Sequence, residues 1–277
     1  MEFWKNTLSF LQSEMQTPTN YSWFHLMFIA FVIIGSFFAI KFAKKSSAKA
    51  MKIVLIVASG VMLLLEVYKQ IVFTFSIVNG QIVGDYQWFA FPFQFCSTPM
   101  YVMLIAGLSK SGRFQSSLTA YLSLFSLFGG LCVYFYPNDV FINMIGINFQ
   151  TMIHHGLQIV IGCYLLSYHR NELNLKFFLK SIPVFITLVA IAMGLNLLAP
   201  TFTTETFNMF FISPFFPCTI VILNTLYAVL PYPLFLLLYL FGFCLASCIM
   251  FLIAFAFGKI FKRKKIKKIN MEKNKKI

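Results

Sequence analysis

The sequence predicts an all-α protein, a polytopic membrane helix bundle of seven transmembrane helices with its N-terminus outside and its C-terminus in the cytoplasm. Of the 277 residues, 59% are hydrophobic and 11% are charged, whereas soluble domains are about 45–50% apolar and about 25% charged. Seven apolar runs are long enough to cross a hydrocarbon core of about 30 Å. The basic residues lie in alternate loops, as the positive-inside rule requires. This composition excludes a soluble fold, a disordered chain and a nucleic-acid binder.

Each expected span is an apolar run without the strict alternation that marks a membrane β-strand, so helices are expected rather than a barrel. Short loops with charged or turn-forming residues separate the runs. The expected spans, in chain order, are Ser22–Ile40, Ile53–Val78, Trp88–Leu108, Gln115–Tyr136, Phe149–Tyr168, Ser181–Ala199 and Tyr232–Phe257.

The orientation follows from the distribution of lysine and arginine. Twenty of the 22 basic residues fall in the first, third and fifth connections and in the tail, while Lys5 lies on the other side and Lys69 lies inside a span. Short basic loops stay in the cytoplasm. The net charge of +14 therefore reports topology, and the basic tail is expected to contact anionic lipids.

Three regions complete the organisation around a transmembrane domain that covers residues 22–258. Residues 1–21 form an extracytoplasmic segment, read either as an interfacial helix or as a frayed tail. Residues 207–230 are apolar but interrupted by Pro214 and Pro217, which predicts a short external helix or re-entrant piece. Residues 259–277 form the basic cytoplasmic tail.

Ionisable residues inside a membrane span are costly and therefore mark candidate sites. Glu66 and Lys69 lie three residues apart in the second span, so they share a helical face and can pair. One interpretation is a structural ion pair, and the other is the polar wall of an internal cavity.

The third and fifth expected spans carry the remaining polar residues. An amide, a thiol and a hydroxyl lie close together in the third span, at Gln94, Cys96 and Thr98. A cysteine in an apolar helix is usually only a small buried residue. In the fifth span Gln150, His154 and Gln158 share one helical face, and His155 points about 100° away. A histidine bonded to a neighbouring helix is the structural alternative to a catalytic one.

The expected depths of these side chains are similar. Cys96 and His154 lie about 8–12 Å below the outer boundary, with His25 shallower and the Glu66–Lys69 pair deeper. We therefore expect one polar cavity open toward the outer leaflet. The spacing of histidine and cysteine supports neither a metal site nor a disulfide, and no cofactor is expected.

Several short pieces together resemble the YwaF-like bacterial integral membrane proteins, a family grouped with eukaryotic transmembrane acyltransferases and androgen-induced fatty-acid-ester hydrolases. The resemblance covers most of residues 22–257. It rests on the order and placement of the pieces along the spans. These are His25, Pro92 to Ser97, Tyr136 to Asp139, Gln150 with His154, Asn208 with Pro214, and Pro231 to Pro233.

The resemblance implies an intramembrane nucleophile and a histidine on another helix, carried by Cys96 and His154, in the plasma membrane of a bacterium. It also places Gln94 where the family has a histidine, and Asn208 in the cavity. The implied function is a lipid acyltransferase or ester hydrolase acting from the outer leaflet. The alternatives are a transporter or binding protein for a small solute or lipid, with its cavity around Glu66 and Lys69, and a non-catalytic membrane scaffold.

Overall fold

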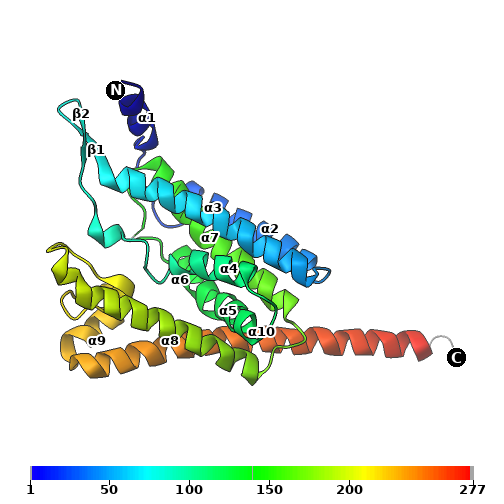
Figure 1. Cartoon of the computed structure of the whole chain (residues 1–277). Coiled ribbons are helices and arrows are strands. Elements are labelled where there is room, and N and C mark those ends of the chain that lie inside the picture. The colour runs from blue at the N-terminus through cyan, green and yellow to red at the C-terminus, as the bar shows by residue number, and fades with distance from the viewer. Residues whose placement is uncertain (1, 139, 275–277) are drawn as a thin grey trace.

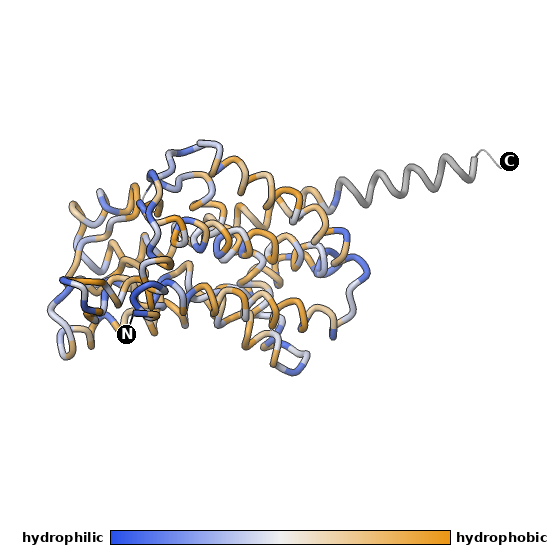
Figure 2. Tube along the Cα trace, turned by 90° about the horizontal axis from the view of Figure 1, so that it is seen from above, coloured by the Kyte–Doolittle hydropathy of each residue, from blue (hydrophilic) through white to orange (hydrophobic). Residues whose placement is uncertain are grey.

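The computed structural model describes the backbone of residues 2–138 and 140–274, and the side chains as far as Lys259. Helices dominate it, and one small hairpin is its β-sheet (Figure 1). Hydrophilic residues gather in the loops at the ends of the bundle, and the helices between them are apolar (Figure 2). Asp139 and most basic residues of the tail lie outside the described side chains, so the contact with anionic lipids stays a prediction.

Five helical stretches within residues 2–138 and 140–274 are long and apolar enough to cross a membrane, which makes this a multi-pass membrane protein. They comprise α2 (Trp23–Ala43), α3 (Ala48–Thr74), the stretch Arg113–Phe135, α8 (Leu175–Leu198) with the turn that follows it, and the first part of α10 (Tyr232–Asn274).

The other two expected spans differ from regular apolar helices. The helix α7 (Ile145–Tyr168) has 24 residues, enough to cross a bilayer, but it carries the polar residues of the fifth span. The third expected span contains a 3-10 turn (Trp88–Ala90) and one short α-helix, α4 (Thr98–Leu108), whose 11 residues reach about 16 Å. Seven spans and their orientation therefore remain predictions.

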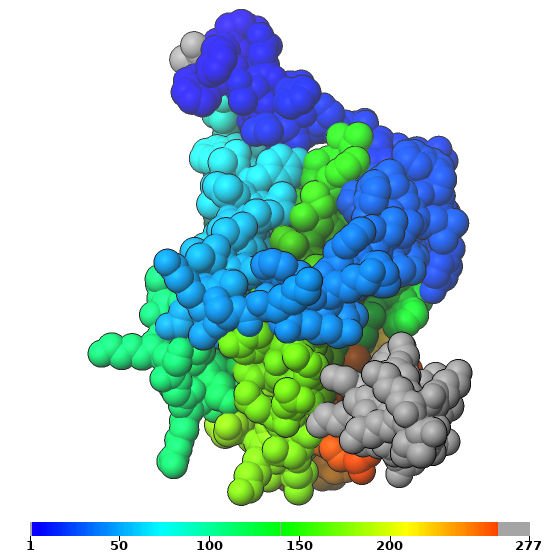
Figure 3. Space-filling view, turned by 90° about the vertical axis from the view of Figure 1, so that its right-hand side faces the viewer, coloured from blue at the N-terminus to red at the C-terminus, as the bar shows by residue number. Residues whose placement is uncertain are grey.

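Within the bundle, α7 lies between α2 and α3 and contacts both (Figure 3). The stretch Arg113–Phe135 comprises α5 (Arg113–Tyr121), a π-helical turn (Leu122–Ser126) and α6 (Leu127–Phe135). All five residues of the π turn are buried, and it contacts α7, α8 and α10. This stretch is thus the centre of the bundle, with α2, α3 and α7 on one side and α8 and α10 on the other (Figure 1).

The second expected span ends earlier than its apolar run suggests. The helix α3 stops at Thr74, and the chain continues as a hairpin of β1 (Phe75–Val78) and β2 (Gln81–Gly84). Asn79 and Gly80 form its turn with positive φ angles of 50° and 71°, the conformation that a tight hairpin turn requires. The apolar residues 75–78 therefore belong to the hairpin and not to the helix.

The N-terminal segment contains α1 (Glu2–Leu11) and is tied to the bundle. The Tyr68 hydroxyl donates to the Leu11 carbonyl at 2.7 Å, and the Gln12 amide donates to the carbonyls of Val72 and Phe75. Phe3 and Trp4 remain exposed. The contacts argue against a frayed tail.

Region 207–230, which the sequence predicts to be external, is mostly irregular. It contains a 3-10 turn (Met209–Phe211) that is buried at Met209 and Phe210, and a short helix, α9 (Leu223–Val229), without a buried residue. The inner half therefore packs into the bundle, and the outer half lies on its surface.

Candidate functional site

Cys96 lies in a non-helical turn just before α4, not inside a transmembrane helix. The turn is closed by the Gln94 carbonyl, which accepts hydrogen bonds from the N–H groups of Ser97 and Thr98 at 2.9 and 3.0 Å. Pro99 stands in the first turn of α4, where the missing N–H of proline costs nothing. The prolines thus set where the helix begins, and the Cys96 carbonyl stays outside any helical ladder.

Two side chains of α7 reach this free carbonyl. His154 Nε2 lies 3.0 Å from Cys96 O, and Gln158 Nε2 donates to the same oxygen at 2.8 Å. His154 and Gln158 are four residues apart and therefore stand one above the other on one helical face. The structure thus brings the Cys96 turn and His154 together through a main-chain atom, and the Cys96 side chain itself is a half-buried free thiol.

The contact with Cys96 fixes the protonation of the His154 ring. A carbonyl oxygen only accepts hydrogen bonds, so Nε2 carries the proton and Nδ1 of the neutral ring keeps its lone pair. Nδ1 is buried and has no hydrogen-bond partner among the described residues. His154 therefore offers a free proton acceptor within the packed bundle.

Two adjacent glycines in α6 allow the helices to approach closely around this site. A Cβ atom on Gly130 would lie 2.8 Å from the His155 carbonyl oxygen, and one on Gly129 would lie 2.7 Å from the Phe95 ring. Both distances are shorter than a carbon atom tolerates. Because glycine has no side chain, α6 can pack closely against both the turn next to Cys96 and the helix that carries His154.

The expected cavity residues Gln94 and Asn208 bind main-chain atoms instead of lining an open space. The Gln94 amide donates to Asn208 O at 3.0 Å and accepts from Phe210 N at 2.9 Å. The Asn208 amide donates to Pro217 O at 3.0 Å and accepts from Ser213 N at 2.8 Å. Together they fasten the inner half of region 207–230 to the Cys96 segment.

The remaining expected site residues lie in separate surroundings. The Thr98 hydroxyl donates to Phe95 O and contacts the Tyr121 hydroxyl, and Gln150 accepts from Thr151. His155 contacts Thr151 O through Nδ1. His25 is fully buried beside Tyr134 and Phe141.

The Glu66–Lys69 pair forms, as its spacing indicates, with Lys69 Nζ 2.8 Å from Glu66 Oε1. The Gln70 amide donates to the same oxygen and to the Ala90 carbonyl, both at 2.8 Å. Glu66 and Gln70 also line a groove of about 350 Å³ between α3 and the segment that contains Pro92. Of the expected site residues, Glu66 is the one that lines this groove.

The comparison with family models decides the classification. The model of the TMEM164 family matches residues 19–254, which includes Cys96, His154 and Glu66. The chain belongs to the TMEM164 family. This is a family of transmembrane proteins, in agreement with the apolar helices. Comparisons with curated proteins and with solved structures give no match. The YwaF-like and acyltransferase resemblance is not part of this result and stays an expectation.

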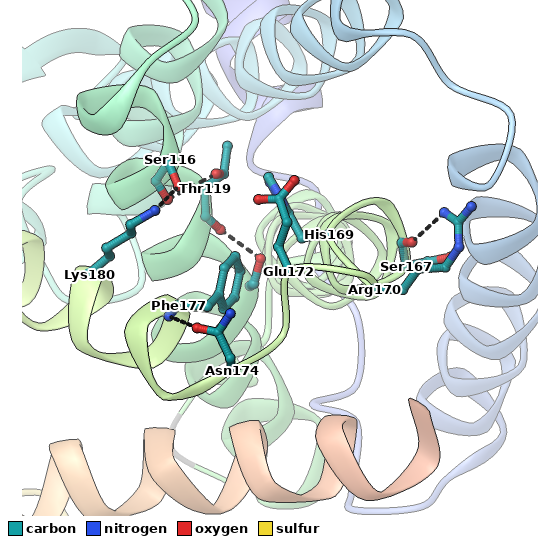
Figure 4. A network of polar contacts seen from close by, with 10 residues as sticks. Ser116, Thr119, Ser167, His169, Arg170, Glu172, Asn174, Phe177 and Lys180 are labelled. Carbon is teal, nitrogen blue, oxygen red and sulfur yellow. Dashed lines mark hydrogen bonds and ion pairs between the residues drawn. The ribbon is translucent and has the colours of Figure 1, made fainter. Parts of the chain in front are cut away.

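In this TMEM164-family protein, a second polar cluster lies at the other end of α7 (Figure 4). His169 follows the helix directly, and its Nδ1 lies 3.2 Å from Glu172 Oε2. Burial lowers the pKa of His169 below the ordinary 6.5; the nearby Glu172 carboxylate raises it and Lys180 lowers it further. Lys180 donates to the Ser116 hydroxyl at 3.1 Å, which ties α8 to α5.

Sequence reasoning missed several residues that hold the site. Phe210 adopts a left-handed conformation with a φ of 57°, which is strained for a bulky side chain. The Tyr239 hydroxyl stabilises this turn by donating to Phe210 O at 2.9 Å. The Asn196 side chain also binds the turn, accepting from Met209 N at 2.7 Å. Asn196 carries a signal in the sequence, because it is a polar residue inside the expected span Ser181–Ala199, whereas the role of Tyr239 has no signature in the sequence.

Proposed function

We propose that this TMEM164-family protein is an intramembrane lipid acyltransferase or ester hydrolase in which Cys96 is the nucleophile and His154 the base. The observation that carries the proposal is the hydrogen bond between His154 Nε2 and the Cys96 carbonyl, which leaves the buried Nδ1 free to accept a proton. The proposal requires Nδ1 to lie beside the Cys96 thiol when substrate is bound, because a thiol needs a base to form the reactive thiolate.

The proposed chemistry has two balanced steps. His154 Nδ1 takes the proton of the Cys96 thiol while the sulfur attacks the ester carbonyl of a lipid. The C–O bond then breaks, and the departing alcohol takes the proton from His154, which leaves an acyl thioester on Cys96. In the second step a hydroxyl group of another lipid, or water, gives its proton to His154 and attacks the thioester. The thiol is restored, and the acyl chain leaves as an ester or a free acid.

Three amide or hydroxyl side chains near Cys96 that could stabilise the developing oxyanion have other partners. The donor groups of Gln94, Thr98 and Gln158 bind carbonyl oxygens of Asn208, Phe95 and Cys96. In the proposed reaction, Gln158 therefore orients the Cys96 turn together with His154. An oxyanion role for any of the three amide or hydroxyl groups would require it to exchange its partner when substrate binds.

The test is to trap the acyl thioester. Purified protein in lipid nanodiscs is incubated with phospholipid that carries an alkyne-tagged acyl chain, and hydroxylamine-labile label is mapped by mass spectrometry. Wild type should carry label on Cys96, and Cys96→Ala and His154→Gln should lose it. Cys132→Ala is the matched control because Cys132 is an exposed thiol on α6. Undiminished label in folded Cys96→Ala would refute the proposal.

A binding or transport function for a small solute or lipid is the second candidate, and the groove beside Glu66 is the observation that favours it. In that case substitutions at Glu66 and Lys69 would abolish uptake or binding, and Cys96→Ala would have no effect. The same nanodisc preparation, assayed for ligand retention, separates the two functions.

A further inference from the structure

The groove on the outer side of α3 combines apolar walls with a buried carboxylate. Its walls include Glu66, Val67, Gln70, Ile71, Pro92 and Tyr101. Val67 and Ile71 are exposed, and exposed apolar residues on a membrane helix face lipid. Glu66 lies eight residues before the end of α3, or about 12 Å along the helix axis. The groove is therefore open to the acyl-chain region of the membrane.

The Glu66 carboxylate is only half satisfied. Oε1 accepts from both Lys69 and Gln70, whereas Oε2 is buried and has no partner within the described part of the chain. The whole residue is 4% exposed. A buried acceptor without a donor costs considerable free energy, so this atom calls for a ligand that supplies an N–H or O–H group.

The charges around Oε2 select among such ligands. Lys69 already neutralises Glu66, so the pair attracts neither an anion nor a cation strongly, and a cationic group would also approach the Lys69 ammonium. A neutral hydroxyl satisfies the acceptor without adding a charge in an apolar setting. The exposed side chains of Val67 and Ile71 would cover an aliphatic chain attached to that hydroxyl.

We propose that the groove binds a neutral amphiphile that bears a hydroxyl group on a long aliphatic chain, with the hydroxyl donating to Glu66 Oε2. Pro92 belongs to the same segment as Cys96, and Tyr101 fastens this segment by donating to the Pro92 carbonyl at 3.1 Å. If the proposed acyl transfer holds, the bound hydroxyl compound lies near the Cys96 turn and serves as the acyl acceptor. The binding itself does not depend on that chemistry.

The experiment is competitive photolabelling of the full chain in nanodiscs. The probe is a long-chain alcohol with a photoactivatable diazirine and an alkyne, and labelled peptides are mapped to the groove. The competitors are dodecanol, its methyl ether and dodecylammonium. Dodecanol should displace the probe about tenfold more strongly than the ether, which lacks the donor. Equal competition by the ether, or stronger competition by the ammonium compound, would overturn the proposal.

Variants test the roles of charge and space separately. Replacing both partners in Glu66→Leu/Lys69→Leu avoids an unpaired buried charge and should abolish the preference for the alcohol. Val67→Trp should block the groove and remove the label without touching a polar group, which serves if the double variant does not fold. Glu205→Leu, at an exposed loop carboxylate, is the control and should label like wild type. Preference retained in the double variant, or full labelling of Val67→Trp, would contradict the assignment.

Cys96→Ala separates this inference from the proposed enzyme. It should bind dodecanol like wild type while forming no acyl thioester. Loss of the thioester reaction in every preparation with alcohol binding intact would remove the enzyme proposal and leave the groove, whereas the reverse pattern would remove the groove.

Discussion

The helices α3 and α7 both carry polar side chains into the bundle, but they satisfy them in different ways. On α7, His154 and Gln158 are buried and bind a carbonyl of a distant segment, which gives them one fixed position. On α3, Glu66 binds Lys69 and Gln70 of its own helix and lines an open groove. Rigid placement suits proton transfer, and a half-satisfied acceptor in the wall of a groove suits ligand recognition.

The strongest test of this contrast compares how a substitution on α7 and a substitution on α3 reduce turnover. His154→Ala should lower the rate of acyl transfer by about 10²–10⁴-fold, the usual contribution of a general base. Glu66→Gln should act mainly on the substrate concentration needed for half-maximal rate. The measurement is transfer of tagged acyl chains in nanodiscs. The distinction fails if both variants lower the maximal rate equally.

The Cys96 segment, which His154 and Gln158 contact, depends on the loop that Asn208 holds. Asn208→Ala should lower the free energy of unfolding, because it leaves the buried Ser213 N–H without a partner, at about 1–3 kcal/mol, and removes the donor to the partly buried Pro217 carbonyl. Asn224→Ala is the control, since Asn224 is exposed on α9. Thermal unfolding in detergent measures both. An equal melting temperature for the two variants would show that the loop does not support the site.

Close helix packing behind His154 gives a further test with a matched glycine. Gly130→Ala should destabilise the protein by about 1–3 kcal/mol, since its Cβ would press on the main chain of α7. In Gly194→Ala the new Cβ meets no atom of the described residues within 4 Å, so this change should be neutral or stabilising by up to about 1 kcal/mol. Reversed effects in the same unfolding assay would contradict the described packing.

The smallest effect is expected at the far end of α7. The pKa of His169 is lower in the folded protein than in the unfolded chain, so the unfolded chain binds the proton more readily. Stability should therefore be complete above about pH 6.5 and should fall as the pH decreases below that value. His169→Gln should flatten this part of the curve. Melting temperatures between pH 5.5 and 7.5 test this, and parallel curves would exclude His169 as the cause.

The sequence predicted the long apolar helices and the Glu66–Lys69 pair because both depend on residues close together in the chain. The hairpin carried a readable signal in Asn79 and Gly80, which the count of apolar residues concealed. The shortened third helix carried a signal in Pro99, which stands in the first turn of α4, whereas the length of the apolar run suggested a full span.

The contacts around the site were beyond the reach of sequence patterns. Gln94 and Asn208 bind main-chain atoms, and main-chain atoms are the same in every residue. The close packing of α6 depends on Gly129 and Gly130, and a pair of glycines in an apolar helix does not reveal which segments pack against it. His25 and Cys96 were assigned by depth to one cavity, but depth along a helix does not say which neighbours a side chain meets.

The π turn at Leu122–Ser126 accommodates one residue more than a regular helix would, because its backbone bonds span five residues instead of four. Deleting one of these five residues would let the helix run on regularly and would leave α6 close to its present orientation. A one-residue insertion continued as regular helix would instead swing everything downstream by about 100°. Gly129 and Gly130 would then face new neighbours, and bulkier side chains would meet Phe95 and α7. One codon removed here would thus be tolerated, whereas one codon added would disrupt the junction between the Cys96 turn and His154.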